Sequence, residues 1–373
     1  MRIADFALER YFARWEFAVR HVLCASDVEG WSMAELLALA DDEARGLWDG
    51  LRLGYTESTG HPLLRAEIAS LYETIAPDDV LVFAGAEEAI FCLVSVLVGP
   101  ADHVVCTWPG YQSLYEVARS AGAKVSLHAL READGWSLEA DRLARSIRPE
   151  TRLVIVNAPH NPTGMLPTRD EWAAVVAACE SVGAVLLADE VYRFLELDPA
   201  DRLRAGADAY PAHGVSLGVM SKSFAMAGLR IGWLATHDHA LLERCMALKD
   251  YTTICSSAPS EILALIGLRA RETVIDRSRA IVAGNLVRIE ALMESHADRF
   301  AWVPPRAGSV AFPRLLRGGP VDAFTARLVE AEGVLLIPAS AFGFGGDHFR
   351  IGLGRTDLPE AVARLEAFLA REG

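Results

Sequence analysis

The feature that most constrains this chain is an alternation of helical and strand-like segments between about residues 60 and 240. The helical segments carry apolar residues at three- and four-residue steps, as in PLLRAEIASLY and EEAIFCLVSVLV. Between them stand short, mostly apolar runs, as expected of strands covered on both faces. These runs are DVLVFAG, HVVCTWP, KVSLHAL, TRLVIVNAP, AVLLADE, VSLGVMS and LRIGWLAT. The alternation predicts an α/β fold with a mostly parallel central sheet sandwiched by helices.

The pattern changes after about residue 270, where a charged helical stretch leads to the short strands SVAFPRL, GVLLIPA and HFRIGLG. The amphipathic helix LPEAVARLEAFLA follows them. We expect a large α/β domain over 40–270 and a smaller α+β domain made of 1–39 and 271–373. Since no Gly/Ser-rich linker is present, the boundary is expected within a long helix.

Charge and composition exclude several classes of partner. The chain has 373 residues and a formal net charge of −14 without a long basic run, which argues against a nucleic acid partner. The N-terminal 20 residues carry charges throughout, and no apolar run approaches the roughly 18 residues that a membrane span needs. The six cysteines are widely spaced, without the spacing of a metal site. We therefore expect a cytoplasmic protein with reduced thiols, no metal and no membrane partner.

Polar residues follow four of the apolar runs directly. They stand in GAEEA at 85–89, NAPHNPTG at 157–164, DEVY at 189–192 and SKSFAMAGLR at 221–230. In open parallel sheets, ligands bind beyond the carboxyl ends of the strands. The sequence therefore predicts a binding site built from these four segments.

Lys222 is the first candidate, because a charge directly after a buried strand is costly unless it is neutralised or paired. A Schiff base with an aldehyde would remove the charge. A partly desolvated amine is a competent nucleophile and a later proton carrier. The alternative is an ordinary lysine in a surface loop.

Asp189 ends the run AVLLA, so it either caps a loop or faces a buried cation such as a protonated pyridine ring. Asn161 and Tyr192 could donate hydrogen bonds to a phenolate oxygen on such a ring. Asn-Pro is also a common turn, however, and tyrosine is common at the edge of a core.

GAEEA is predicted to begin a helix, where the backbone N–H groups of Ala86 and Glu87 would form an anion site suited to a phosphate. Ser221 could add a hydroxyl group to that site. Arg230 could add a positive charge and two parallel hydrogen bonds to the same phosphate.

The segments NPTG, DEVY and SK followed by AGLRIGW stand in one order and at separations that resemble the class I/II aminotransferases of pyridoxal 5'-phosphate (PLP) fold type I. The resemblance extends from about Gly54 to Arg355. It implies the cofactor PLP, with amino acids and 2-oxo acids as small-molecule substrates. It also implies a homodimer with shared active sites.

The resemblance assigns a role to each matching residue. Lys222 corresponds to the lysine of the internal aldimine and Asp189 to the partner of the pyridinium nitrogen. Asn161 and Tyr192 correspond to the residues that bond the phenolic oxygen. Tyr111 corresponds to the aromatic residue stacked on the cofactor, and its alternative is a plain core tyrosine.

Five residues match the phosphate cup, namely Gly85, Ala86, Glu87, Ser221 and Arg230. Tyr55 resembles the tyrosine that reaches the phosphate of the neighbouring subunit. Arg350 resembles the arginine that grips the substrate α-carboxylate with two parallel hydrogen bonds, and Asn161 is assigned to the substrate as well. The alternative for Arg350 is an edge-strand arginine that faces solvent.

Two departures from the family pattern stand out. Val219 occupies a position where the family has Ser or Thr for the phosphate, and the N-terminal segment reads LCASDVEGWSMAELLAL instead of a glycine-rich loop. With PHNPTG, KDYTT and PPRAGSVAFPRL, this segment resembles the subgroup of capreomycidine synthase, which cyclises a hydroxylated arginine derivative. As a hypothesis, Asp27 and Glu29 bind a basic side chain; the alternative is two solvated carboxylates.

These residues predict ping-pong transamination between an L-amino acid and a 2-oxo acid through Lys222. The alternative is a non-transaminating PLP reaction, namely elimination, replacement or cyclisation, because all of these reactions share Lys222 and Asp189. The absence of a basic helix-turn-helix segment argues against a DNA-binding regulator of this fold. The presence of both residues argues against an inactive relative.

Overall fold

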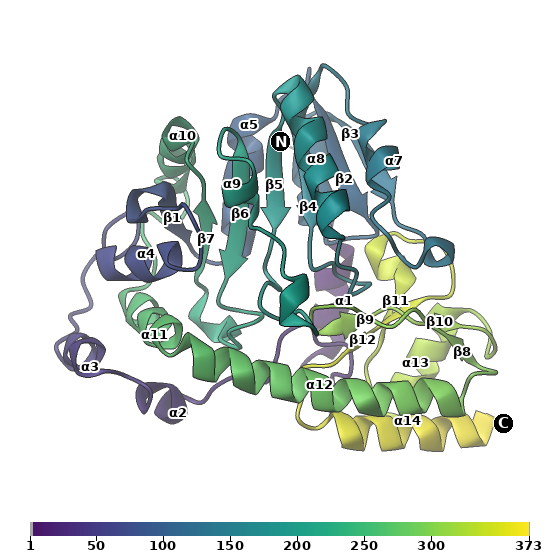
Figure 1. Ribbon diagram of the computed structural model, residues 1–373. Helices are drawn as coiled ribbons and strands as arrows, with labels where there is room; N and C mark the ends of the chain where they lie inside the picture. The colour runs from purple at the N-terminus through teal and green to yellow at the C-terminus, as the bar shows by residue number, and fades with distance from the viewer. Residues whose placement is uncertain (1–2, 373) are drawn as a thin grey trace.

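The computed structural model describes residues 3–372 and has the α/β architecture expected from the sequence (Figure 1). Its central sheet has seven strands in the order β1-β7-β6-β5-β4-β2-β3. The strands are β1 (Val80–Phe83), β2 (His103–Trp108), β3 (Lys124–Ala129), β4 (Thr151–Asn157), β5 (Val185–Asp189), β6 (Gly214–Val219) and β7 (Gly232–Ala235). Each apolar run of the sequence forms one of them.

The direction of β7 determines what reaches the edge of the sheet. The pairs β2–β3, β2–β4, β4–β5 and β5–β6 are parallel, whereas β7 is antiparallel to both β1 and β6. Gly232, the first residue of β7, therefore pairs with Phe83 and Val219, the last residues of its neighbours. The loop that precedes β7 meets the carboxyl ends of the other strands.

Alternate residues of each strand enter opposite helical layers, as the two-residue period of a strand requires. In β4, Leu153 and Ile155 pack with the core under α5 (Ala86–Leu97), α6 (Ser113–Ser120) and α10 (His239–Lys249). Val154 and Val156 pack on the other face. That face is covered by α4 (Pro62–Ala69), α7 (Ala140–Ala144), α8 (Arg169–Val182), α9 (Gly206–Ala209) and α11 (Ala258–Arg269).

The C-terminal part forms two small sheets below the large one (Figure 1). Their strands are β8 (Phe300–Ala301), β9 (Val310–Ala311), β10 (Arg314–Leu315), β11 (Ile337–Pro338) and β12 (Phe349–Gly352). Around them lie α12 (Arg271–Ser295), α13 (Val321–Glu332) and α14 (Leu358–Glu372). Since α11 ends at Arg269 and α12 begins at Arg271, the proposed boundary falls between two helices and not within one. The domain limits themselves stay a prediction.

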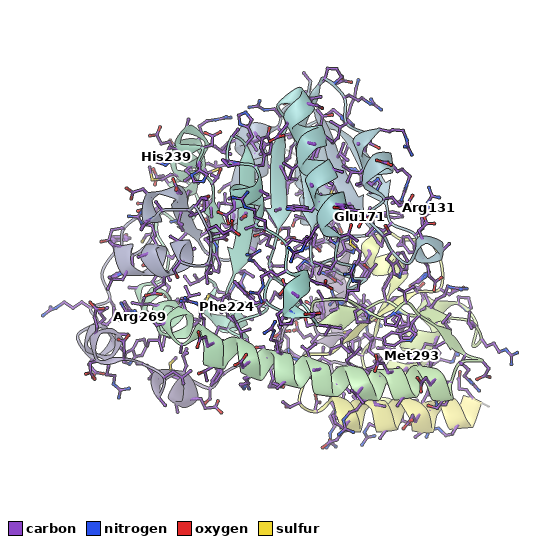
Figure 2. All side chains as sticks on the ribbon, in the orientation of Figure 1. Arg131, Glu171, Phe224, His239, Arg269 and Met293 are labelled. Atoms are coloured by element: carbon purple, nitrogen blue, oxygen red, sulfur yellow. The ribbon has the colours of Figure 1, made fainter. Side chains whose placement is uncertain are left out.

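The N-terminal segment contacts both parts of the molecule. Helix α1 (Ala7–Trp15) lies beneath the sheet (Figure 1), whereas α2 (Met33–Leu37) and α3 (Asp42–Asp49) pack against α11. Figure 2 shows Arg269 beside α3, where it forms ion pairs with Asp41 and Glu43. Between α1 and α2 the chain pairs with the C-terminal strands, since Gly352 N donates to Leu23 O at 2.7 Å. Within residues 3–372, no helix has the length and apolarity of a membrane span.

Candidate active site

A cavity of about 520 Å³ lies where the carboxyl ends of β4, β5 and β6 meet the N-terminal segment. Ten of the residues assigned from the sequence line it, namely Ala86, Glu87, Tyr111, Asn161, Asp189, Tyr192, Ser221, Lys222, Arg230 and Arg350. Gly85 is not among the residues that line the cavity, but it directly precedes Ala86 in the chain. The strand-end segments thus converge on one space, as expected from the sheet topology.

The start of α5 and Arg230 form a positively polarised cup. Gly85 has a φ of 87° and caps α5, and a Cβ atom there would lie 2.6 Å from Nη2 of Arg230. A Cβ atom on Gly232 would lie 2.6 Å from Ala86 N, so the glycines allow β7 to bring Arg230 against the helix. Arg230 itself is left-handed, with a φ of 53°, a conformation that costs a non-glycine residue about 1–2 kcal/mol. Helix N–H groups beside a guanidinium suit a phosphate dianion.

Asp189 is a buried acid, with 4% of its surface exposed. Burial raises the pKa of Asp189 to about 7, and the nearby Lys222 opposes the rise. Among residues 3–372, Asp189 forms no ion pair, although the Val191 N–H lies 3.4 Å from its Oδ1. A buried carboxyl of this kind is suited to a cation such as a protonated ring nitrogen.

Two asparagines connect the strand ends. Asn157 Nδ2 donates to Asp189 O at 3.0 Å, and Asn157 Oδ1 accepts from Asn161 N at 2.7 Å. The Asn161 side chain in turn accepts from Arg350 Nη1 at 3.1 Å. Sequence reasoning did not assign Asn157, although it is the polar last residue of β4.

Lys222 faces the cavity. Its Nζ donates to Ser26 Oγ at 2.8 Å and lies 5.8 Å from the ring centre of Tyr192, which is buried. Val219, the residue that departs from the family pattern, is buried and also lines the cavity.

Arg350 is 1% exposed, so it is not an arginine that faces solvent. Its Nε and Nη2 donate to Cys24 O at 3.0 and 2.9 Å, in addition to the bond from Nη1 to Asn161. The guanidinium is therefore held from two directions while it lines the cavity. Cys24 contributes its backbone carbonyl oxygen, so its residue type gave no reason to assign it to the site from the sequence.

Tyr111 and Glu87 line the cavity together with residues of α1. Tyr111 packs on Phe6, with ring centres 4.9 Å apart, and its hydroxyl donates to Glu9 Oε1 at 3.3 Å. Burial raises the pKa of Tyr111 above its ordinary value. Burial also raises the pKa of Glu87, whose Oε2 accepts from Ser113 Oγ at 3.0 Å.

The N-terminal segment adds three polar residues that sequence reasoning missed: Glu9, Glu16 and Ser26 line the cavity. The sequence did hold a signal for one face of a helix, since residues stand at three- and four-residue steps, namely Phe6, Glu9, Phe12 and Glu16. Asp27 reaches the cavity, but both of its oxygens accept from Arg355 Nη2, at 3.1 and 3.0 Å. Glu29 does not line the cavity, and its Oε2 accepts from the Thr356 backbone and hydroxyl instead.

Tyr55 is 90% exposed and does not line the cavity of its own chain. Its assigned role at a neighbouring subunit stays a prediction.

Residues 23–365 match the family model for aminotransferase class I and II. The chain belongs to this family. Capreomycidine synthase of Streptomyces vinaceus is 29% identical over 97% of this chain and 92% of its own length. Arginine–pyruvate transaminase of Pseudomonas aeruginosa is 29% identical over 83% of this chain and 81% of its own length. The structure of a PLP-dependent aminotransferase from Streptococcus suis is 27% identical, with a TM-score of 0.93 over 100% of this chain and 99% of that one.

The cofactor of this aminotransferase is PLP, and the cavity fits it in two respects. The cradle at Gly85, which a Cβ atom would fill, is suited to the phosphate group. The buried acid Asp189 stands in the same cavity as Lys222, and an acid beside a lysine is the donor set that a pyridine aldehyde requires.

Proposed function

We propose that this aminotransferase moves an amino group from an L-amino acid to a 2-oxo acid by a ping-pong mechanism that depends on Lys222. The observation that carries the proposal is the convergence of Lys222, Asp189 and Arg350 on one cavity. A lysine, a buried acid and a buried arginine provide an attachment point, a partner for a ring nitrogen and a carboxylate clamp.

Each group of residues has a place around the cofactor. Asp189 would hold the ring nitrogen, Asn161 and Tyr192 the phenolic oxygen, and Tyr111 the ring face. The phosphate would be held by the cup of Gly85, Ala86, Glu87, Ser221 and Arg230. When bound, PLP supplies an electron sink for the negative charge that develops at the substrate α-carbon.

The protein's own groups bind and orient the amino acid. Arg350 binds the α-carboxylate, and its bonds to Cys24 and Asn161 fix the plane of the guanidinium. The free amine of Lys222 takes the proton from the α-carbon and later returns it as an acid. Phe6, which precedes α1, and Phe12 on α1 line the cavity with apolar side chains, which disfavour water beside the reacting groups.

A panel of single amino acids tests this function. Holoenzyme mixed with its donor, without an acceptor, should release one equivalent of 2-oxo acid and accumulate the aminated form of the cofactor. Absorbance follows the cofactor, and mass spectrometry identifies the product. A product that keeps its amino group, with no 2-oxo acid formed, contradicts transamination.

That contrary result would support the second candidate, a non-transaminating reaction such as cyclisation or elimination. The likeness to capreomycidine synthase over 97% of this chain favours it. Both candidates need the same attachment at Lys222 and the same acid at Asp189, so only the product distinguishes them.

We further propose a donor with a cationic side chain. Among residues 3–372, neither Glu9 nor Glu16 forms an ion pair, although both line the cavity. Burial, Asp27 and Glu9 raise the pKa of Glu16, so a nearby cation would relieve an unfavourable charge. The name of the similar arginine–pyruvate transaminase agrees with a substrate related to arginine.

Glu16→Gln should lower kcat/KM for arginine about tenfold relative to leucine, because a hydrogen bond to a charged group contributes about 1.5–3 kcal/mol. Glu29→Gln is the matched control, since Glu29 belongs to the same N-terminal segment but does not line the cavity. An unchanged ratio of arginine to leucine in Glu16→Gln would contradict the cationic donor.

We propose, finally, a homodimer in which Tyr55 reaches the neighbour's phosphate cup. Leu53, Tyr55 and Tyr251 are 87%, 90% and 89% exposed, and large exposed apolar side chains mark interaction surfaces. Analytical ultracentrifugation should show a dimer. Tyr55→Phe should weaken PLP binding without dissociating the dimer. A fully active monomer would contradict this assembly.

A further inference from the structure

Ser26 makes a contact that the proposed function leaves unused. Its Oγ accepts a hydrogen bond from Lys222 Nζ at 2.8 Å. Among residues 3–372, it is the one side chain that hydrogen-bonds to the Lys222 amine. Ser26 also lines the cavity, so this contact lies inside the site.

Ser26 belongs to a segment, residues 23–27, that is fixed to the C-terminal strands. Its carbonyl oxygen accepts from the hydroxyl of Ser309 at 2.7 Å, and Ser309 is fully buried. A Cβ atom on Gly352 would lie 2.1 Å from Ala25 O, and one on Gly354 would lie 2.1 Å from Asp27 O. Such close backbone packing leaves segment 23–27 little room to shift.

The same segment contacts both the residue proposed to bind the substrate α-carboxylate and the residue proposed to take the α-proton. The Cys24 carbonyl holds Arg350, and two residues later the Ser26 hydroxyl meets Lys222. A lysine side chain is a flexible four-carbon stem, whereas a general base must be within reach of its proton in a defined direction. A fixed hydroxyl reduces the freedom of the amine relative to the carboxylate clamp.

We propose that Ser26 is a positioning residue for the Lys222 amine. One N–H of the neutral amine is donated to Ser26 Oγ, which leaves the nitrogen lone pair directed at the substrate α-carbon. The Cα–H bond then breaks, an N–H bond forms on Lys222, and the electron pair stays with the α-carbon. The inference rests on the proposed proton transfer by Lys222, but not on the fate of the amino group.

The first test needs no substrate. When the cofactor-free protein is mixed with PLP in a stopped-flow instrument, the covalent attachment to Lys222 should be about ten- to a hundredfold slower in Ser26→Ala. The affinity for pyridoxamine 5'-phosphate, which forms no bond to the lysine, should not change. Ser26→Thr, which keeps the hydroxyl, should recover the rate, and Ser181→Ala on the exposed side of α8 should match the parent.

The second test follows the α-proton itself. In D₂O, exchange of the donor's α-proton should slow by a similar factor in Ser26→Ala, and the α-deuterium isotope effect on turnover should rise while KM stays constant. Unaltered attachment kinetics in Ser26→Ala, or a slower reaction without a larger isotope effect, overturns the proposal. A parent enzyme that exchanges the proton without forming a 2-oxo acid contradicts transamination alone.

Discussion

The two halves of the cavity are built in different ways. On the sheet side, Asn161, Asp189 and Lys222 each stand within four residues of the end of a strand. On the opposite side, Arg350 is held by the carbonyl oxygen of Cys24, which lies 326 residues earlier in the chain, and Ser26 contacts Lys222, which lies 196 residues later. In the proposed function, the sheet side therefore holds the cofactor, whereas the opposite side orients the amino acid and the Lys222 amine.

Lys222→Ala should have the largest effect, because it removes the group on which both halves act. We expect turnover and α-proton exchange to fall about 10²- to 10⁴-fold, the usual contribution of a general base. Borohydride reduction followed by mass spectrometry should find no cofactor attached to the variant. Lys124→Ala, on an exposed position of β3, is the control and should keep both activity and attachment.

Arg350→Ala should affect the substrate side alone. It removes the carboxylate clamp and leaves Cys24 O and Asn161 Oδ1 without their donor. The loss of hydrogen bonds to a charged group should lower kcat/KM about ten- to a hundredfold. PLP affinity, measured by absorbance titration, should match that of the parent and of Arg317→Ala, a surface control. A large loss of cofactor affinity would remove the distinction between the two halves.

On the sheet side of the cavity, Asp189→Asn should change how the stability of the cofactor-free protein depends on pH. Burial raises the pKa of Asp189 from 3.8 to about 7. An acid with a raised pKa contributes to folded stability fully below pH 3.8, and the contribution is lost as the pH rises through about 7. The melting temperature of the cofactor-free parent should therefore fall more steeply between pH 5 and pH 8 than that of the variant. Parallel curves would show that Asp189 does not titrate in this range.

Glu87→Gln should have the smallest effect. Burial raises the pKa of Glu87, and an ionised carboxylate next to the phosphate cup repels the cofactor dianion. At alkaline pH the variant should bind PLP about two- to threefold more tightly than the parent, since one weakened like-charge contact is worth up to about 1 kcal/mol. At acidic pH the difference in PLP affinity between variant and parent should be smaller. Glu116→Gln on α6 is the control. Weaker binding in Glu87→Gln would indicate a direct hydrogen bond from the acid to the phosphate.

Sequence patterns predicted the sheet side well because its information is local. An apolar run such as AVLLA defines a buried strand, and the charged residue that follows it, Asp189, must then lie at the strand end. The parallel order of the strands brings Asp189 and Lys222 together without any further information.

The N-terminal side could not be predicted in the same way. Ser26 meets Lys222 across 196 residues, and nothing in LCASDVEG specifies that contact. Cys24 acts through its carbonyl oxygen, which every residue carries. Asp27 was proposed with Glu29, but the tertiary positions of Arg355 and Thr356 decide what each acid meets.

The pairing of segment 23–27 with β12 has a consequence for how the enzyme matures on the ribosome. Residue 23 is made early, yet its partner Gly352 is made near the end of the chain. The large sheet, complete at Ala235, can collapse while its arginine clamp is still unsynthesised. A nascent or C-terminally truncated chain would thus contain Lys222 and Asp189 but lack Arg350, the proposed carboxylate clamp.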